Sequence, residues 1–194
     1  MSSPVDSIQS ILASEHASFL TRVVSSLQTL GISLPPNYAI DHICYRTSTT
    51  NEYMRRKAEL ATLGTLLVEN DIGGRLIACY KLHAEHALRW PQSTAASGVE
   101  SIDRVIDVVE LPAPKPGRLY PSGLEHVEVV VDDMSLEDFA AWHQDVKFDW
   151  SGMKKPINRD LRIDFREGGV EGGGFSVKFH EQTLEKVIEI EKAM

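Results

Sequence analysis

The chain has 194 residues, with 20 Lys and Arg against 28 Asp and Glu, and so a formal net charge of −8 at pH 7. This length and an ordinary composition predict one hydrophobic core, or two small modules that share one. The acidic balance argues against duplex nucleic acid or an anionic membrane surface as a partner. No apolar run approaches the roughly 18 residues that span a bilayer.

The N-terminus has no basic segment followed by an apolar one, so we expect an intracellular, cytoplasmic protein. Either a monomer or a homodimer is expected. Cys44 and Cys79 are too few and too isolated for a disulfide framework or a thiolate zinc site. Both are expected to be free thiols in a reducing compartment.

The first half of the chain predicts a helix, a strand, a second helix, a hairpin and a further strand. Apolar residues recur at helical spacing over 5–30, until Gly31 and the following prolines stop the pattern. Thr49 and Glu52 have the spacing of a capping box, and "NDIGG" is typical of a hairpin turn. The expected elements are a strand over 38–46, a helix over 49–63, strands on both sides of 70–74 and a strand over 104–112. The polar segment 83–103 is expected to be a surface excursion.

The second half repeats this order. A strand over 124–131 leads to a helix capped by Ser135, then to strand-like runs at 146–150, 161–165 and 175–180, and to a C-terminal amphipathic helix. The repetition suggests one βαβββ unit used twice. We expect an N-terminal helical segment (1–36), a first module (37–112) and a second module with the C-terminal helix (113–194), together forming one compact domain.

Alternation along the strands predicts one apolar face and one polar face. The polar set takes one residue from each of four strands, namely His42, Glu110, His126 and His180. A sheet with helices on one face and a concave polar face on the other satisfies this pattern. By the same alternation, Asp41 and Glu125 are expected to point to the opposite face.

The paired modules and the segments "DH", "VELP", "EHVEVV" and "VKFH" resemble the bacterial YecM family, a branch of the vicinal oxygen chelate superfamily that also includes glyoxalase I and extradiol dioxygenases. The resemblance implies an α+β fold, in which paired βαβββ modules form a curved mixed sheet around a metal-binding cup, with an N-terminal helical extension. Carried over by position, it implies a divalent metal held by His42, Glu110, His126 and His180. Many superfamily enzymes have a glutamate where this sequence has His180.

Two imidazoles and a carboxylate suit Fe(II), Mn(II), Zn(II) or Ni(II), and a three- or four-ligand site on a six-coordinate ion leaves adjacent positions open for a bidentate oxygen substrate. Glu128 follows His126 on the same face and is the candidate general base if it is not a ligand. Arg46 and Lys178 have the parity to face the cup, where they would contact a substrate anion or line an ordinary polar cleft. Cys44 is either a soft ligand or a small buried residue.

Two other signals have simpler interpretations. His83 and His86 have helical spacing, but they lie in the turn-rich excursion, and so a solvated loop is expected there. The glycine-dense segment 166–175 lacks the Lys-Ser/Thr of a phosphate loop and predicts a flexible hairpin, or a lid over the cup.

These observations favour a metal-dependent enzyme of the isomerase, lyase or oxidoreductase type that acts on a small oxygen-bearing substrate. The alternative is a non-catalytic protein that binds or sequesters a small molecule in the same cup. A protein-interaction domain that uses the N-terminal helix and the excursion is a third hypothesis. Because one fold hosts several chemistries, the fold alone does not choose the reaction.

Overall fold

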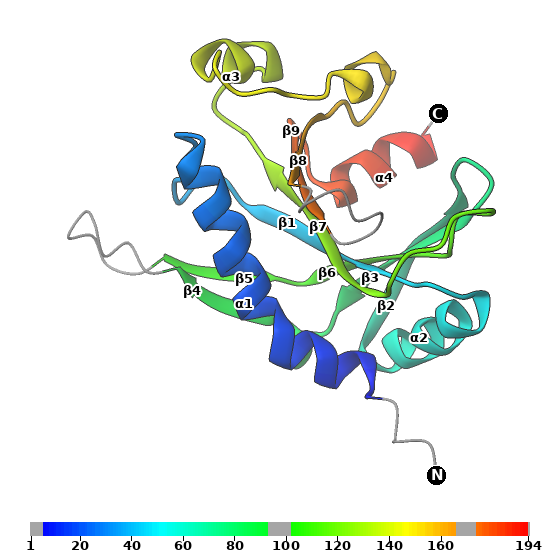
Figure 1. Cartoon of the computed structure of the whole chain (residues 1–194). Helices are drawn as coiled ribbons and strands as arrows, with labels where there is room; N and C mark the ends of the chain where they lie inside the picture. The colour runs from blue at the N-terminus through cyan, green and yellow to red at the C-terminus, as the bar shows by residue number, and fades with distance from the viewer. Residues whose placement is uncertain (1–5, 93–101, 166–173, 194) are drawn as a thin grey trace.

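The computed structural model describes residues 6–92, 102–165 and 174–193. Within these ranges the chain forms four α-helices, a seven-stranded mixed sheet and a separate two-stranded sheet (Figure 1). The strand order in the large sheet is β2-β3-β6-β1-β7-β9-β8. No helix in the described ranges combines the length and the apolar character needed to cross a membrane.

The strands of the large sheet are β1 (Ile40–Arg46), β2 (Gly64–Asp71), β3 (Leu76–Leu82), β6 (Val108–Pro112), β7 (Gly123–Val130), β8 (Leu161–Phe165) and β9 (Phe175–His180). The small sheet pairs β4 (Leu88–Gln92) with β5 (Ile102–Ile106). In the large sheet, β1 pairs antiparallel with β7 and parallel with β6, while β7 pairs parallel with β9. The two halves of the sheet therefore meet at β1 and β7, the first strands of the two predicted modules.

The helices are α1 (Ile8–Thr29), α2 (Thr50–Leu63), α3 (Leu136–Trp142) and α4 (Leu184–Ala193), with short 3₁₀ turns η1 (Ala84–His86) and η2 (Ser151–Lys154). The expected caps are present: the Thr49 hydroxyl accepts a hydrogen bond from the Glu52 amide, and Ser135 accepts one from the Asp138 amide. Each cap satisfies an amide that has no partner within its own helix, which fixes where the helix begins.

Three of the helices cover the apolar face of the sheet, as the alternation predicts. Ile43, Val127 and Phe179 are fully buried on this face and share one core with residues of α1 and α2. The Phe139 ring of α3 packs 4.7 Å from that of Phe179. Residues from all three predicted segments contribute to this core.

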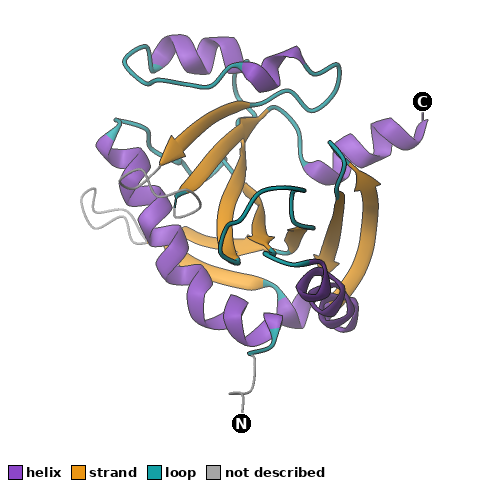
Figure 2. Cartoon of the chain, turned by 45° about the vertical axis from the view of Figure 1, so that its right-hand side comes forward, coloured by secondary structure: helices purple, strands orange, loops and turns teal. Residues whose placement is uncertain are grey.

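The fourth helix lies on the opposite, polar side. Leu184, Val187 and Ile188 of α4 help line the cavity on that side of the sheet. The first turn of α4 is held by Asp41, whose carboxylate accepts a hydrogen bond from the Leu184 amide at 3.0 Å. Figure 2 shows α4 alongside the strands, away from the long helix α1.

Two expected elements differ in the structure. The strand predicted over 104–112 is broken between β5 and β6, so alternation does not carry through Asp107: Val105 is 46% exposed, whereas Ile106 is buried. The segment 146–150 forms only an isolated bridge, Asp149 with Arg162. The second module therefore has three strands of the large sheet where four were expected, within the ranges that the structure describes.

The ends of the excursion over 83–103 form regular secondary structure, which its polarity did not predict. Its first part forms η1 and β4, where Leu88 and Trp90 are buried against the core, and α1 contacts β4. Residues 93–101 and most of the glycine-dense segment, 166–173, lie outside the described residues.

Candidate metal centre

Two cross-strand rows of side chains build the polar face of the sheet. The strand registers place Arg162, Lys178, Glu128 and His42 side by side in one row, across β8, β9, β7 and β1. They place Ser176, His126, Cys44, Glu110 and Cys79 in the next row, across β9, β7, β1, β6 and β3. Because strand neighbours lie about 5 Å apart, these two rows concentrate the polar side chains in one area.

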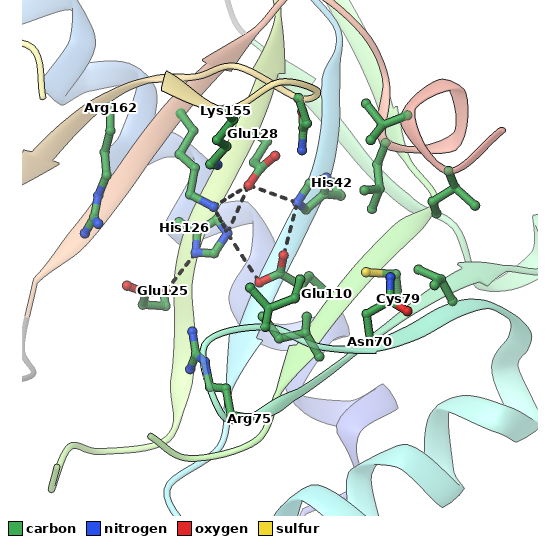
Figure 3. A pocket seen from close by; sticks show the side chains of 18 of the residues that line it. His42, Asn70, Arg75, Cys79, Glu110, Glu125, His126, Glu128, Lys155 and Arg162 are labelled. Carbon is green, nitrogen blue, oxygen red and sulfur yellow. Dashed lines mark hydrogen bonds and ion pairs between the residues drawn. The ribbon is translucent and has the colours of Figure 1, made fainter. Parts of the chain in front are cut away.

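Four side chains converge at the junction of the two rows. His42, Glu110, His126 and Glu128 each offer one ligand atom, and these four atoms all lie within 4.8 Å of one another (Figure 3). His42 Nε2 lies 3.9 Å from Glu110 and 3.5 Å from Glu128, and His126 Nε2 lies 3.6 Å and 3.5 Å from the same carboxylates. All four residues are buried or nearly so.

An acidic neighbour orients each imidazole, against the expectation that Asp41 and Glu125 face away. Asp41 accepts a hydrogen bond from His42 Nδ1 at 2.9 Å, and Glu125 accepts one from His126 Nδ1 at 2.7 Å. The β1–β7 register shifts at both acids: Asp41 has no partner between the pairs Ile40–Val129 and His42–Glu128, and Glu125 has none between the pairs Cys44–His126 and Tyr45–Leu124. These β-bulges break the strict alternation, which explains why parity misplaced both carboxylates.

The consequence for the two histidines is chemical. A carboxylate can only accept a hydrogen bond, so Nδ1 carries the proton in each ring and Nε2 is directed into the cluster. Metal-binding histidines commonly donate their second nitrogen to a carboxylate in this way. His42 Nε2 is buried and has no hydrogen-bond partner among the described residues, which fits a group whose partner would be a bound cation.

The cluster is strongly coupled electrostatically. Burial lowers the pKa of His42, but the charge of Glu128 and the hydrogen bond with Asp41 outweigh it and raise that pKa to about 10. Burial raises the pKa of Glu128, but the charges of Lys178 and His42 outweigh it, and the pKa lies well below its ordinary value. The pKa of His126 is raised, since Glu125 and Glu128 outweigh burial and Lys178. Protons and the Lys178 ammonium therefore balance the carboxylates when no metal is bound.

Lys178, rather than His180, occupies the position in β9 that corresponds to Glu110 in β6. Glu110 stands opposite Cys44, two residues after His42, and Lys178 stands opposite Glu128, two residues after His126. The Lys178 ammonium forms an ion pair with Glu128 and lies 3.3 Å from His126 Nε2.

His180 lies two residues after Lys178 in β9, outside the group formed by His42, Glu110, His126 and Glu128. Its Nε2 is 2.7 Å from the second carboxylate oxygen of Glu128. The group of neighbouring ligand atoms thus includes Glu128, which the sequence suggested as a base, and not His180, which contacts that carboxylate instead.

The cysteine nearest the centre is a less suitable ligand. Cys44 Sγ lies within 4.8 Å of ligand atoms of Glu125 and His126. Burial and the nearby carboxylates raise the pKa of its thiol well above the ordinary value, and metals bind the thiolate.

A cavity of about 370 Å³ opens over the cluster, and it contains residues that the sequence analysis missed. Arg75, Lys115, Lys155 and Arg162 line it together with Ser176 and α4. Alternation puts Arg162 on the polar face of its strand, so this residue could have been found; Arg75 and Lys115 lie in connections between strands, where no periodicity applies. Arg46 is not in the lining: its guanidinium stacks 4.5 Å from the Tyr120 ring centre and lies 3.8 Å from Glu125.

The remaining histidines lie elsewhere. His83 is exposed at the start of η1, as expected for a solvated residue, and His86 is partly exposed. Neither belongs to a group of metal-ligand atoms in the described part of the chain.

Comparison with known proteins places the chain in a family. The model of the YecM protein family matches residues 9–191, and the chain belongs to this family. It is 30% identical to Protein YecM of Escherichia coli strain K12, over 97% of this chain and 96% of that one. An uncharacterised protein of Haemophilus influenzae is 24% identical over 68% of this chain and 61% of its own length.

Among solved structures, a protein designated EC4020 has the same fold, with a TM-score of 0.58, 23% identity and coverage of 97% of this chain and 100% of that chain. A Streptomyces coelicolor methylmalonyl-CoA epimerase in complex with 2-nitronate-propionyl-CoA aligns at a TM-score of 0.42 with 11% identity, over 73% of this chain and 96% of its own. The resemblance to the YecM family seen in the sequence is thereby confirmed, as is the α+β fold with its large mixed sheet and N-terminal helix.

Proposed function

We propose that the protein is a divalent-metal-dependent enzyme of the vicinal oxygen chelate type, which acts on a small oxygen-bearing substrate in an isomerase, lyase or oxidoreductase reaction. The observation that carries this proposal is the convergence of His42, Glu110, His126 and Glu128 from three strands, with ligand atoms within 4.8 Å of one another. Two imidazoles and two carboxylates suit Fe(II), Mn(II), Zn(II) or Ni(II). A bound ion would polarise the substrate oxygens and stabilise negative charge on them.

Each side chain would have a defined task. Asp41 and Glu125 keep the two Nε2 atoms aimed at the centre, so that little reorganisation accompanies binding. Glu128 is better suited to hold a cation than to act as the base, because its low pKa makes it a weak proton acceptor. The Lys178 ammonium lies beside the centre, where it would stabilise an oxyanion developing on the substrate.

The same ammonium supports a second candidate function. Lys178 lies 3.3 Å from His126 Nε2 and pairs with Glu128, so a cation from the chain itself already balances part of the cluster. This arrangement also suits a protein that binds or sequesters a small molecule in the cavity without a metal. Metal content separates the two functions.

The deciding experiment is elemental analysis of the full chain, purified without added metal or chelator, for the wild type and for His42→Ala, Glu110→Gln and His126→Ala. We expect about one transition-metal ion per chain in the wild type and a loss of tight binding in each variant. His83→Ala removes an exposed imidazole outside the cluster and should keep the ion. A metal-free wild type that also fails to bind Mn(II), Zn(II), Fe(II) or Ni(II) on titration would refute the metal-dependent enzyme and favour the binding protein.

A further inference from the structure

The cavity has a basic wall, formed by Arg75, Lys115 and Arg162, that the proposed metal centre does not use. Arg75, from the connection between β2 and β3, Lys115, from the connection between β6 and β7, and Arg162, from β8, all line the cavity. Figure 3 shows Arg75 and Arg162 on the side of His126 and Glu125. Cationic side chains from three separate segments therefore converge at one wall, beside the four proposed ligands.

These cations are poorly neutralised. Among the described residues, neither Arg75 nor Lys115 forms an ion pair; Arg75 donates a hydrogen bond only to the Ala113 carbonyl, at 3.3 Å. Arg162 pairs with Asp164, but its Nε is buried without a hydrogen-bond partner in the described part of the chain, and its direct neighbour across the strands is Lys178. Like charges placed side by side are unfavourable unless an anion lies between them.

The pKa of Lys115 reflects the positive charge of its neighbours. Partial burial lowers the pKa of its ammonium, and so does the repulsion from Arg75, Arg118 and Arg162, against the attraction of Glu125. Glu125 attracts Lys115, but it already accepts a hydrogen bond from His126 and lies 3.8 Å from Arg46. The free protein thus holds net positive charge at this wall, although the whole chain is acidic.

A second, independent feature points into the same space. Ser176 lines the cavity, is 1% exposed, and has a buried hydroxyl oxygen with no hydrogen-bond partner among the described residues. It stands directly opposite His126 in the β7–β9 register, on the strand that separates β7 from β8, which carries Arg162. A buried hydroxyl without a partner costs free energy, which a ligand oxygen would recover.

We propose that Arg75, Lys115 and Arg162 bind an oxyanionic group, a carboxylate or a phosphate, of the substrate, and that Ser176 donates a hydrogen bond to an oxygen next to it. This inference rests on the proposed function, since it makes that substrate a small organic anion whose other oxygens would reach the ion held by His42 and His126. Guanidinium groups bind such planar or tetrahedral oxyanions in a two-pronged manner, which gives orientation as well as affinity.

The test uses the full chain, freed of metal with a chelator, and two probes, inorganic phosphate and malonate, titrated by calorimetry. Saturable binding of either probe is expected, and the tighter probe identifies the group. Arg75→Met, Lys115→Met and Arg162→Met should each weaken binding about tenfold, the usual loss for one charge-assisted contact. Ser176→Ala, which is nearly isosteric, should weaken it by a smaller factor.

The matched control is Arg118→Met, which removes the same charge from a residue outside the cavity lining. Thermal unfolding of each variant confirms that the fold is retained. No saturable binding of either probe to the wild type, or an equal loss in Arg118→Met, would overturn the anion site.

Metal titrations of the same variants separate the two proposals. The anion-site variants should still bind metal, because none of their side chains is a proposed ligand. Anion binding without metal binding in the wild type would refute the metal-dependent enzyme and support the anion site. Metal binding without anion binding would refute the anion site and support the metal-dependent enzyme.

Discussion

At the scale of single residues, a lysine stands beside the four proposed metal ligands. Lys178 occupies the position in the second module that Glu110 occupies in the first, and it contacts both Glu128 and His126. Burial disfavours its ammonium, but Glu128 and Glu110 outweigh this effect and raise the pKa, so the side chain stays charged. A bound divalent ion and this ammonium would repel each other across the cluster.

We therefore expect Lys178→Met to bind a divalent metal more tightly than the wild type, by about tenfold, because one nearby positive charge is removed at low effective dielectric. Competition with a chromophoric chelator would measure the affinity. Lys186→Met removes a charge from the exposed side of α4 and serves as the control. Weaker metal binding in Lys178→Met would show that the ammonium stabilises the site instead.

Proton release upon metal binding tests the same electrostatics. The pKa of His42 is raised to about 10 without metal, so its ring is protonated at neutral pH and must lose a proton to bind an ion; the pKa of His126 is raised as well. Affinity should rise with pH from about 6 toward 10, by about tenfold per pH unit for each proton displaced. Calorimetry in buffers of different ionisation enthalpy counts these protons. An affinity that is flat over this range would mean that the imidazoles are not ligands.

At the scale of elements, two β-bulges decide where the acids beside the histidines point. The bulges in β1 and β7 turn Asp41 and Glu125 toward the Nδ1 atoms of the histidines that follow them. Asp41 has a second task, since the same carboxylate accepts from the Leu184 amide and holds the start of α4. One side chain thus connects a proposed ligand to the helix that lines the cavity.

Asp41→Asn keeps an acceptor oxygen for α4 but loses the negative charge that orients His42. We expect metal affinity to fall at least about tenfold, as for other outer carboxylates of metal sites, with little loss of stability. Asp41→Ala should lose affinity similarly and also lower the free energy of unfolding by about 1 kcal/mol, because the Leu184 amide at the start of α4 loses its acceptor. Urea unfolding and metal titration of both variants provide the measurement. Unchanged affinity in Asp41→Asn would separate Asp41 from the site.

At the scale of the whole molecule, the small sheet and the N-terminal helix act as a scaffold away from the cavity. Arg104 of β5 is 5% exposed and donates to the carbonyls of Leu34 at 2.7 Å and Pro35 at 3.1 Å, and also to that of Tyr38. These carbonyls lie in the segment between α1 and β1. One buried guanidinium thus fastens that segment to the second sheet.

Arg104→Met should lower the free energy of unfolding by about 3 kcal/mol, because three carbonyls lose a charged donor in a buried setting. Arg89→Met is the control on the adjacent strand. The Arg89 side chain is 64% exposed and forms a single exposed ion pair with Asp103 at 3.4 Å, so we expect the free energy of unfolding to change by no more than about 0.5 kcal/mol. Both variants should bind metal like the wild type. Reduced metal binding in a folded Arg104→Met would contradict the separation of scaffold and site.

Much of this molecule follows from local rules in the sequence. The helices and most strands lie where periodicity and capping residues place them, since Thr49 and Ser135 determine where two helices begin through interactions three residues long. Alternation correctly assigned Ile43, Val127 and Val177 to the core face, because one face of each strand is buried. The same rule placed His42, Glu110 and His126 together on the polar face, where the structure brings their ligand atoms within reach of one ion.

What only the tertiary structure decided depends on register and on turns. Alternation cannot reveal a bulge, so the direction of Asp41 and Glu125 required the β1–β7 pairing. Alternation also places His180 and Lys178 on one face without saying which of them stands level with Glu128; only the β7–β9 register does so. Arg75 and Lys115 line the cavity from the connections between strands, whose positions in space no periodic pattern encodes. Long-range packing, rather than local sequence, brings these connections to the cavity.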